Sequence, residues 1–287
     1  MASVTAIVLT LNEEKNIETC IRRLRPLAER VVVVDSGSTD GTVALAKRLG
    51  AEVLEHKFID YSHQFNWALE NAGIQTEWVM RVDADEFYTP ELNNELETLL
   101  QVHAHDDVNG ILTESRFYFM GRRIDHGGFK KRKIVVFRNG CGSIEKRRMD
   151  EHTIVPQGRV IEAKHRFDHM DYKDLHAFVT KLAGYAEREA DDYFAERDQY
   201  RIGTVELSGV GDEKLIRTRI RKYRLYYRLP PFLRCWMLFI YAYIFRLGFL
   251  DGREGFIYHY LYQRWYRTLV DATILEREKQ IKASKGV

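Results

Sequence analysis

Three short apolar segments, each followed at once by a polar cluster, constrain the fold of this chain most strongly. They are residues 4–11, Val31–Val34 and Trp78–Val82. Four consecutive valines are typical of a strand buried on both faces. Between the first two segments Ile17, Ile21 and Leu24 recur at i, i+4 and i+7, on one face of a helix. Strands and helices that alternate in this way predict a mostly parallel central sheet with helices on both faces.

Weaker patterns extend the same alternation along the chain. Further strands are expected at residues 53–54, 110–118 and 134–137. Further helices are expected at residues 61–72, from Pro90 onward, and at residues 172–193.

The polar clusters begin at Thr10, Asp35 and Asp83, where the three apolar segments end. In parallel sheets ligands bind beyond the carboxyl ends of the strands, so these clusters should meet at one rim. Asp83 and Asp85 are spaced i, i+2 and can both face a divalent cation. Carboxylate oxygens suit Mg²⁺ or Mn²⁺, which commonly bridge to phosphate. A short acidic triplet also fits a solvated turn, but its place at the end of a buried strand favours the metal.

Composition excludes several classes of protein. The 287 residues are 45% hydrophobic, enough to bury a full core. Lysine and arginine number 44 against 42 acidic residues, and this balance argues against a nucleic-acid binder. Cys20, Cys141 and Cys235 form no CxxC pair, which argues against a disulfide framework or a structural zinc site and indicates a reducing cytosol.

Three motifs carry a resemblance to a known family. Val8-Leu-Thr-Leu-Asn-Glu-Glu, Val34-Asp-Ser-Gly-Ser-Thr-Asp-Gly-Thr and Val82-Asp-Ala-Asp-Glu resemble, in order and spacing, the motifs of family 2 glycosyltransferases. The resemblance implies the GT-A fold, an α/β fold, and an inverting transfer from a nucleotide sugar. His169-Met-Asp-Tyr172, with Lys181 and Tyr185, is similar to a subgroup that includes bacterial lipopolysaccharide-core β-1,4-glucosyltransferases.

The same resemblance implies a nucleotide-sugar site at the rim. The residues expected there are Thr10, Asn12, Glu13, Asp35, Asn66, Asp83 and Ala84. Two of them have a structural alternative. Asn12 can cap the helix that follows it, and Asp35 can form an Asx-turn with Ser38.

The metal and the catalytic base are also expected by resemblance. Asp85 is expected to be the main ligand of Mg²⁺ or Mn²⁺, with Asp83 sharing the ion and His169 as a further ligand. Glu151 is the expected base that takes the proton from the acceptor hydroxyl, and Asp150 could exchange roles with it. The alternative is that this acidic pair only neutralises the basic residues 146–148.

The function expected is transfer of a hexose from a nucleotide sugar such as UDP-glucose. The acceptor would be a saccharide or a lipid-linked molecule in lipopolysaccharide-core or exopolysaccharide synthesis. A nucleotidyltransferase acting on sugar phosphates is the first alternative, although residues 12–14 replace the Gly-rich basic loop of such enzymes. A non-catalytic scaffold at the membrane surface is the second, and the intact Asp83, Asp85 and Glu151 argue against it.

The last quarter of the chain differs in composition. We expect a catalytic domain over residues 1–212 and a helical, aromatic and basic extension over residues 213–287. Basic residues between 214 and 228 precede an apolar run, residues 232–250, that is too short and too interrupted to span a bilayer. This pattern predicts peripheral attachment to the anionic cytoplasmic face of the inner membrane. The alternatives are an amphipathic helix that packs on the catalytic domain or one that forms a homodimer.

The basic loop at residues 130–133 is either a solvated face or a grip for an anionic acceptor.

Overall fold

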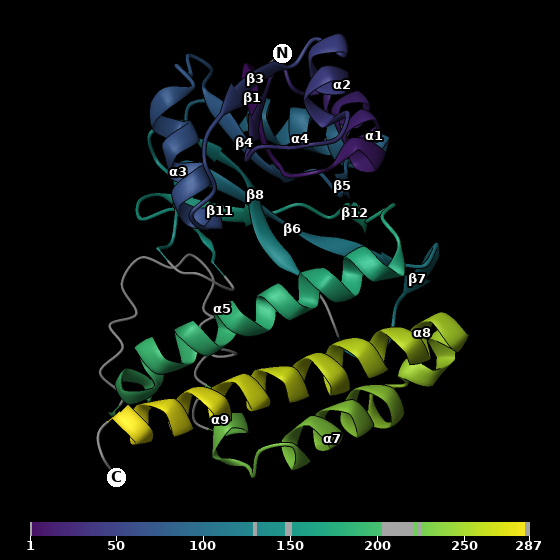
Figure 1. The fold of residues 1–287 in the computed structure, drawn as a ribbon. Coiled ribbons are helices and arrows are strands. Elements are labelled where there is room, and N and C mark those ends of the chain that lie inside the picture. Colours follow the sequence, from purple (N-terminus) through teal and green to yellow (C-terminus); the bar gives the residue numbers. More distant parts are fainter. Residues whose placement is uncertain (1, 129–130, 147–150, 203–220, 223–224, 285–287) are drawn as a thin grey trace.

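The computed structural model describes residues 2–128, 131–146, 151–202, 221–222 and 225–284 (Figure 1). Its strands are β1 (Val4–Thr10), β2 (Arg30–Asp35), β3 (Glu52–Glu55), β4 (Trp78–Asp83), β5 (Glu86–Phe87), β6 (Val108–Phe119), β7 (Arg122–Ile124), β8 (Arg132–Arg138), β9 (Ser143–Ile144), β10 (Thr153–Ile154), β11 (Arg159–Glu162) and β12 (Phe167–Met170).

Its α-helices are α1 (Glu14–Leu24), α2 (Thr42–Arg48), α3 (Tyr61–Asn71), α4 (Pro90–Val102), α5 (Leu175–Ile202), α7 (Leu233–Ile240), α8 (Gly252–His259) and α9 (Arg267–Ser284). Shorter helical turns are η1 (Tyr226–Arg228), η2 (Tyr241–Phe245), η3 (Gly248–Asp251) and η4 (Tyr260–Tyr266).

One large sheet organises the N-terminal two thirds of the chain. Its strand order is β3-β2-β1-β4-β8-β6-β12-β5, and β7 and β11 also pair with β6. The first four strands are mutually parallel, and β11 and β12 run parallel to β6. The pairs that β8 makes with β4 and β6 are antiparallel. The predicted sheet, parallel over most of its pairs, is therefore confirmed.

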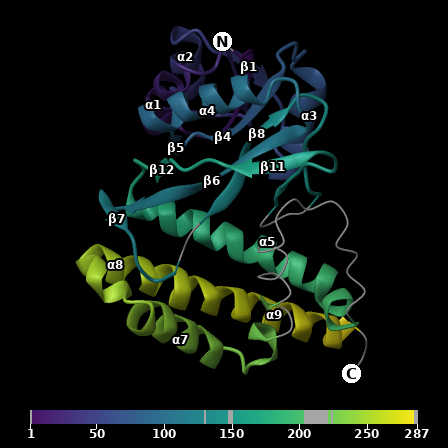
Figure 2. The same cartoon turned by 180° about the vertical axis from the view of Figure 1, so that it is seen from behind.

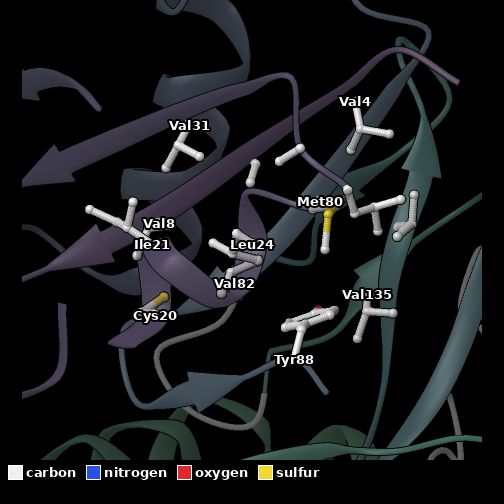
Figure 3. Close-up of a cluster of buried hydrophobic side chains, with 14 of the residues drawn as sticks. Val4, Val8, Cys20, Ile21, Leu24, Val31, Met80, Val82, Tyr88 and Val135 are labelled. Carbon is white, nitrogen blue, oxygen red and sulfur yellow. The ribbon is translucent and has the colours of Figure 1, made fainter. Parts of the chain in front are cut away.

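The valine run of β2 shows how the sheet acquires a core on each side. Val31 and Val33 pack in a cluster with α1, α2 and α4, whereas Val32 and Val34 pack in a second cluster with α3. Successive strand residues face opposite sides of a sheet, so four apolar residues in a row require both sides to be covered. Figure 3 shows Ile21 of α1 gathered with strand residues of the first cluster. Helices on both faces complete the α/β GT-A fold that the resemblance implies.

The helix predicted at residues 172–193 begins later and ends later than expected. The α5 helix starts at Leu175, where the Asp174 carboxylate accepts a hydrogen bond from the backbone N–H of Ala177 at 2.9 Å. It continues to Ile202 because its far half packs on a helix from the end of the chain.

The C-terminal helices form a layer beyond the sheet. In both views α5 and α9 lie side by side, and α7 lies on the outer side of α9 (Figures 1 and 2). Leu182 and Ala186 of α5 share a buried cluster with Val270 and Ile274 of α9. The predicted helical extension is confirmed. The predicted domain boundary at residue 212 lies outside the described residues and stays a prediction.

A buried ion pair fastens α7 to α9. The guanidinium of Arg234 bonds both carboxylate oxygens of Asp271, with Nε at 3.0 and 3.1 Å. The backbone N–H of Phe232 donates to the same carboxylate at 2.8 Å. Both charged side chains are buried. Removal of one partner would therefore leave the other charge buried without a counter-ion.

We predict that Asp271→Ala lowers the free energy of unfolding by about 3–5 kcal/mol, because Arg234 loses its buried counter-ion. The control Glu18→Ala removes an exposed ion pair with Arg22 and should cost less than about 1 kcal/mol. Urea denaturation measures both changes. The double variant Arg234→Met/Asp271→Leu should recover most of the loss. If Asp271→Ala costs no more than the control, the pair does not fasten α7.

Candidate active site

The rim at the ends of β1 and β2 is built around the carboxylate of Asp35. This carboxylate accepts hydrogen bonds from Thr10 Oγ1 at 2.9 Å and from Ser38 Oγ at 2.5 Å. It also accepts from the backbone N–H groups of Gly37 and Ser38 at 2.9 and 2.7 Å. The Asx-turn foreseen as an alternative is therefore present. Contact of Thr10 or Asp35 with a nucleotide stays a prediction.

Asn12 does not cap α1, so that alternative is wrong. Its backbone is left-handed, with φ of 55°, a conformation that asparagine tolerates. Its side-chain oxygen turns to the neighbouring loop and accepts from the backbone N–H of Thr39 at 2.8 Å. The N–H groups of Glu13 and Glu14 instead donate to Thr42 and Asp40. Asn12 thus joins the first and second polar clusters, and nucleotide contact stays a prediction.

The Glu13 side chain connects the rim to the segment before α5. It accepts from Asn16 Nδ2 at 2.7 Å and from Lys173 Nζ at 2.5 Å. Burial and the nearby charge of Asp85 raise the pKa of Glu13, although Lys173 opposes them.

Asp83, at the end of β4, lies in a group of alternating charges. Its carboxylate accepts from the Tyr61 hydroxyl at 2.5 Å and lies 3.5 Å from Lys133 Nζ and 3.7 Å from Lys131 Nζ. Burial opposes ionisation, but the two lysines hold the pKa of Asp83 well below its usual range. Glu86 is fully buried and bonds Lys133 Nζ at 2.5 Å. Burial and the Asp83 charge raise the pKa of Glu86.

Asp85 faces a different pair of side chains. One of its oxygens, Oδ2, lies 3.3 Å from His169 Nε2 of β12 and 3.2 Å from Lys181 Nζ of α5. Despite burial, Lys181 and His169 hold the pKa of Asp85 well below its usual range. Ala84, between the two aspartates, buries its methyl group in the first core cluster. It therefore supports the turn from the core side, and its contact with a nucleotide stays a prediction.

Asp85 and His169 fit two positions around a divalent ion. Neighbouring ligands of an octahedral ion, each at about 2.1 Å, lie about 3 Å apart, close to the observed separation of 3.3 Å. The other ring nitrogen of His169, Nδ1, is buried without a hydrogen-bond partner among the described residues. No group of three or more His, Cys, Asp or Glu side chains suited to a metal occurs in the described part of the chain. The remaining ligands would have to be phosphate oxygens and water.

Arg81 connects the acidic group to the expected base. Its guanidinium lies 3.7 Å from the Glu151 carboxylate and donates to the Tyr61 hydroxyl at 3.1 Å and to Thr153 Oγ1 at 3.2 Å. Because Tyr61 bonds Asp83, the structure brings Glu151 to the same site as the metal residues. Asp150 lies outside the described residues.

Asn66 is placed differently from the other expected residues. Its amide exchanges two hydrogen bonds, both 2.9 Å, with the backbone of Ile144 in β9. The side chain thereby fixes β9 against α3. A contact with the donor stays a prediction.

Sequence reasoning did not single out Tyr61, Arg81 and Glu86 as site residues. It placed Lys133 in a loop that was either a solvated face or a grip for an anionic acceptor, whereas Lys133 is buried and bonds Glu86. One signal was available. Arg81 stands between Met80 and Val82 inside an apolar strand, and a charge in such a place requires buried partners.

Comparisons with known proteins identify the family of this chain. The model of glycosyl transferase family 2 matches residues 5–156, a little over half of the chain. An uncharacterized glycosyltransferase of Rickettsia felis is 36% identical over 106 residues, which is 37% of each chain. The lipopolysaccharide core biosynthesis glycosyltransferase LpsC of Rhizobium meliloti is 32% identical over 167 residues, 56% of this chain and 60% of LpsC.

Two further matches are shorter or more distant. The succinoglycan biosynthesis protein ExoA of Rhizobium meliloti is 37% identical over 91 residues, 29% of this chain and 28% of ExoA. Glucosyl-3-phosphoglycerate synthase from Mycobacterium tuberculosis is 22% identical, with a TM-score of 0.33 and coverage of 41% of this chain and 44% of that chain. The chain thus spans less than two thirds of the length of each of these relatives. The family match covers all three motifs of the rim, and the chain belongs to glycosyl transferase family 2.

Proposed function

We propose that the protein is an inverting hexosyltransferase of cell-envelope polysaccharide synthesis. The donor is a nucleotide sugar such as UDP-glucose, and the acceptor is a saccharide or lipid-linked molecule of the lipopolysaccharide core or an exopolysaccharide. Family membership supports the transfer of a sugar, and the names of LpsC and ExoA support the envelope pathway. Resemblance to the lipopolysaccharide-core β-1,4-glucosyltransferases makes that subgroup our first choice. No motif of this chain matches a nucleotidyltransferase. A non-catalytic scaffold would not require the buried charged side chains of the site.

The observation that carries the proposal is the balanced charge of the site. Three carboxylates, Asp83, Asp85 and Glu86, are neutralised by three amines, which belong to Lys131, Lys133 and Lys181. A divalent ion alone would upset this balance, and so would a diphosphate alone. Bound together, they bring opposite charges that nearly cancel. The site is therefore suited to a metal–diphosphate pair, which is the leaving group of a nucleotide sugar.

Asp85 and His169 would hold the Mg²⁺ or Mn²⁺ ion, with Asp83 beside them. When bound, the ion offsets the negative charge that develops on the leaving diphosphate. Lys181 contacts the Asp85 oxygen that an ion would need, so a bound ion would leave the Lys181 ammonium free to contact the phosphate oxygens. The lysine thereby keeps Asp85 ionised before the donor arrives.

Glu151 is the proposed base. The acceptor hydroxyl attacks the anomeric carbon, the bond to the diphosphate breaks on the opposite face, and the hydroxyl proton passes to the Glu151 carboxylate. Arg81 orients this carboxylate by a charge contact at 3.7 Å. Through Tyr61 it also fixes the distance between the base and Asp83.

We propose peripheral attachment to the anionic cytoplasmic face of the inner membrane, where a lipid-linked acceptor would be met. The aromatic and basic composition after residue 213 supports this location. A homodimer through the C-terminal layer is the competing arrangement.

We predict that Asp85→Asn weakens binding of UDP in Mn²⁺ at least tenfold, to the level that the unaltered protein shows in EDTA. The amide keeps the shape of the side chain but loses the charge that binds the ion. In the unaltered protein, Mn²⁺ and UDP should each bind more tightly in the presence of the other. Isothermal titration measures all these affinities, and Asp107→Asn, at an exposed position, is the control. Equal UDP affinity in Asp85→Asn and the control would remove Asp85 from the metal site.

We predict that Glu151→Gln separates binding from chemistry. The amide cannot accept a proton, so transfer should fall by about 10²-fold or more while the affinity for donor stays within twofold. UDP release from UDP-glucose, measured with envelope extract as the acceptor, follows the transfer. Glu91→Gln, on the exposed first turn of α4, is the matched control. Transfer within a few-fold of that control would eliminate Glu151 as the base.

A further inference from the structure

Exposed apolar side chains gather in one part of the C-terminal layer. Among the described residues, 23 large apolar side chains are exposed, and 14 of them lie between residues 225 and 260. They are Leu225, Phe232, Leu233, Trp236, Met237, Ile240, Tyr241, Ile244, Phe245, Leu247, Phe249, Leu250, Phe256 and Tyr260. Phe245 is 73% exposed. A contiguous apolar surface of this kind marks a place of contact with a partner or a membrane.

The charges within this surface indicate an anionic partner. Residues 225–250 contain no Asp or Glu and three arginines. Arg234 is neutralised by Asp271, whereas Arg228 and Arg246 are exposed. A second copy of the chain would offer the same arginines across a twofold axis, and the two carboxylates at the edge of this surface are already engaged, Asp251 with His126 and Glu254 with Arg122. Phospholipid phosphates, in contrast, complement both arginines.

A pocket of about 220 Å³ lies at the edge of this surface. Its lining residues are Gly127, Gly128, Leu238, Tyr241, Ala242, Arg246 and Gln263. The lining combines an apolar wall with one guanidinium and contains no carboxylate. Both glycines have positive φ, and a Cβ on Gly128 would lie 3.0 Å from Arg246 Nε. This lining suits a phosphate that is attached to an apolar chain.

Residues that pack on one another lie between this pocket and the metal site. The Asp251 carboxylate accepts from the backbone N–H of His126 at 3.0 Å, and the N–H of Gly127 donates to the Arg246 carbonyl at 2.9 Å. Tyr258 of α8 packs against Phe117, with ring centroids 4.8 Å apart, and Phe117 lies edge-on to His169 at 5.4 Å. The elements around the pocket are thus connected to His169 through the packing of α8 on β6.

The first helix of this segment is too short to cross a bilayer by itself. Among the described residues, no single helix is long and apolar enough to cross a bilayer. The helices Leu233–Phe245 and Gly248–Ser284 pass that test only as a pair bent by 73°. The first of them, at about 1.5 Å per residue, is about 20 Å long, shorter than the hydrocarbon core of about 30 Å. Trp236, Tyr241 and Tyr260 are side chains that prefer the interface.

We propose that residues 232–260 dock on an anionic bilayer, with their apolar side chains in the interface and Arg246 paired with a phospholipid phosphate. The inference deepens the membrane attachment of the proposed function by assigning it to a surface. The sequence placed the attachment between residues 214 and 249, and residues 214–220 and 223–224 lie outside the described part of the chain. The described surface supplies the apolar component and a phosphate site of its own.

Co-sedimentation with vesicles of phosphatidylcholine and about one-third phosphatidylglycerol tests the surface without any donor. The unaltered protein should bind at about 0.1 M salt and less at higher salt, because salt screens the arginine contribution. Phe245→Asp/Leu250→Asp should abolish binding, whereas Val102→Asp, at a position 68% exposed on α4, should not. Arg246→Gln should weaken binding about fivefold on anionic vesicles and little on pure phosphatidylcholine. Arg22→Gln, on exposed α1, is its control.

The depth to which Trp236 enters the bilayer is measured by quenching of tryptophan fluorescence with brominated lipid. Quenching should be strong and should be lost in Trp236→Phe. Titration of UDP with the same samples reports on the donor site separately, so failure of one proposal leaves the other testable. Absence of vesicle binding would overturn the docking surface. So would a homodimer in light scattering that Phe245→Asp/Leu250→Asp dissociates, because the surface would then belong to a second copy. Equal binding of Arg246→Gln and its control would overturn the phosphate site.

Discussion

The rest of the structure depends on how three carboxylates are kept together at the end of β4. Asp83, Asp85 and Glu86 lie within four residues, and their mutual repulsion and burial both disfavour ionisation. Three lysines from two parts of the chain offset this cost. Lys131 and Lys133 arrive with the strand that pairs with β4, and Lys181 arrives from α5. The active site is therefore an assembly of the sheet, the β8 hairpin and the first helix of the C-terminal layer.

This assembly explains why the C-terminal layer is fastened so firmly. Lys181 can neutralise Asp85 only if α5 keeps its position, and α5 is held by its packing on α9. In turn α9 carries Asp271, which anchors α7. The layer whose outer helices present an apolar surface thus also places a charge in the active site through α5.

Much of the fold could be predicted from the sequence because its signals are local. The valines of β2, the helical spacing in α1 and the polar strand ends require no knowledge of distant contacts. The extent of α5 could not be predicted, since its second half is stabilised by residues 78 to 86 positions away. The alternative that Asn12 caps α1 was wrong, because the left-handed backbone of Asn12 depends on a loop from the next strand. The carboxylates that Lys133 and Lys181 meet could not be predicted for the same reason, since nothing near either lysine in sequence marks them.

The central claim is that the acidic group at the end of β4 holds a metal–diphosphate pair. A crystal structure with Mn²⁺ and UDP, with the ion located by its anomalous scattering, tests this most directly. The account predicts one manganese peak within about 2.5 Å of both Asp85 Oδ2 and His169 Nε2. It also predicts that Lys181 Nζ has moved from Asp85 to a phosphate oxygen. A manganese ion bound away from both residues, or UDP bound at the rim without an ion, would contradict the account.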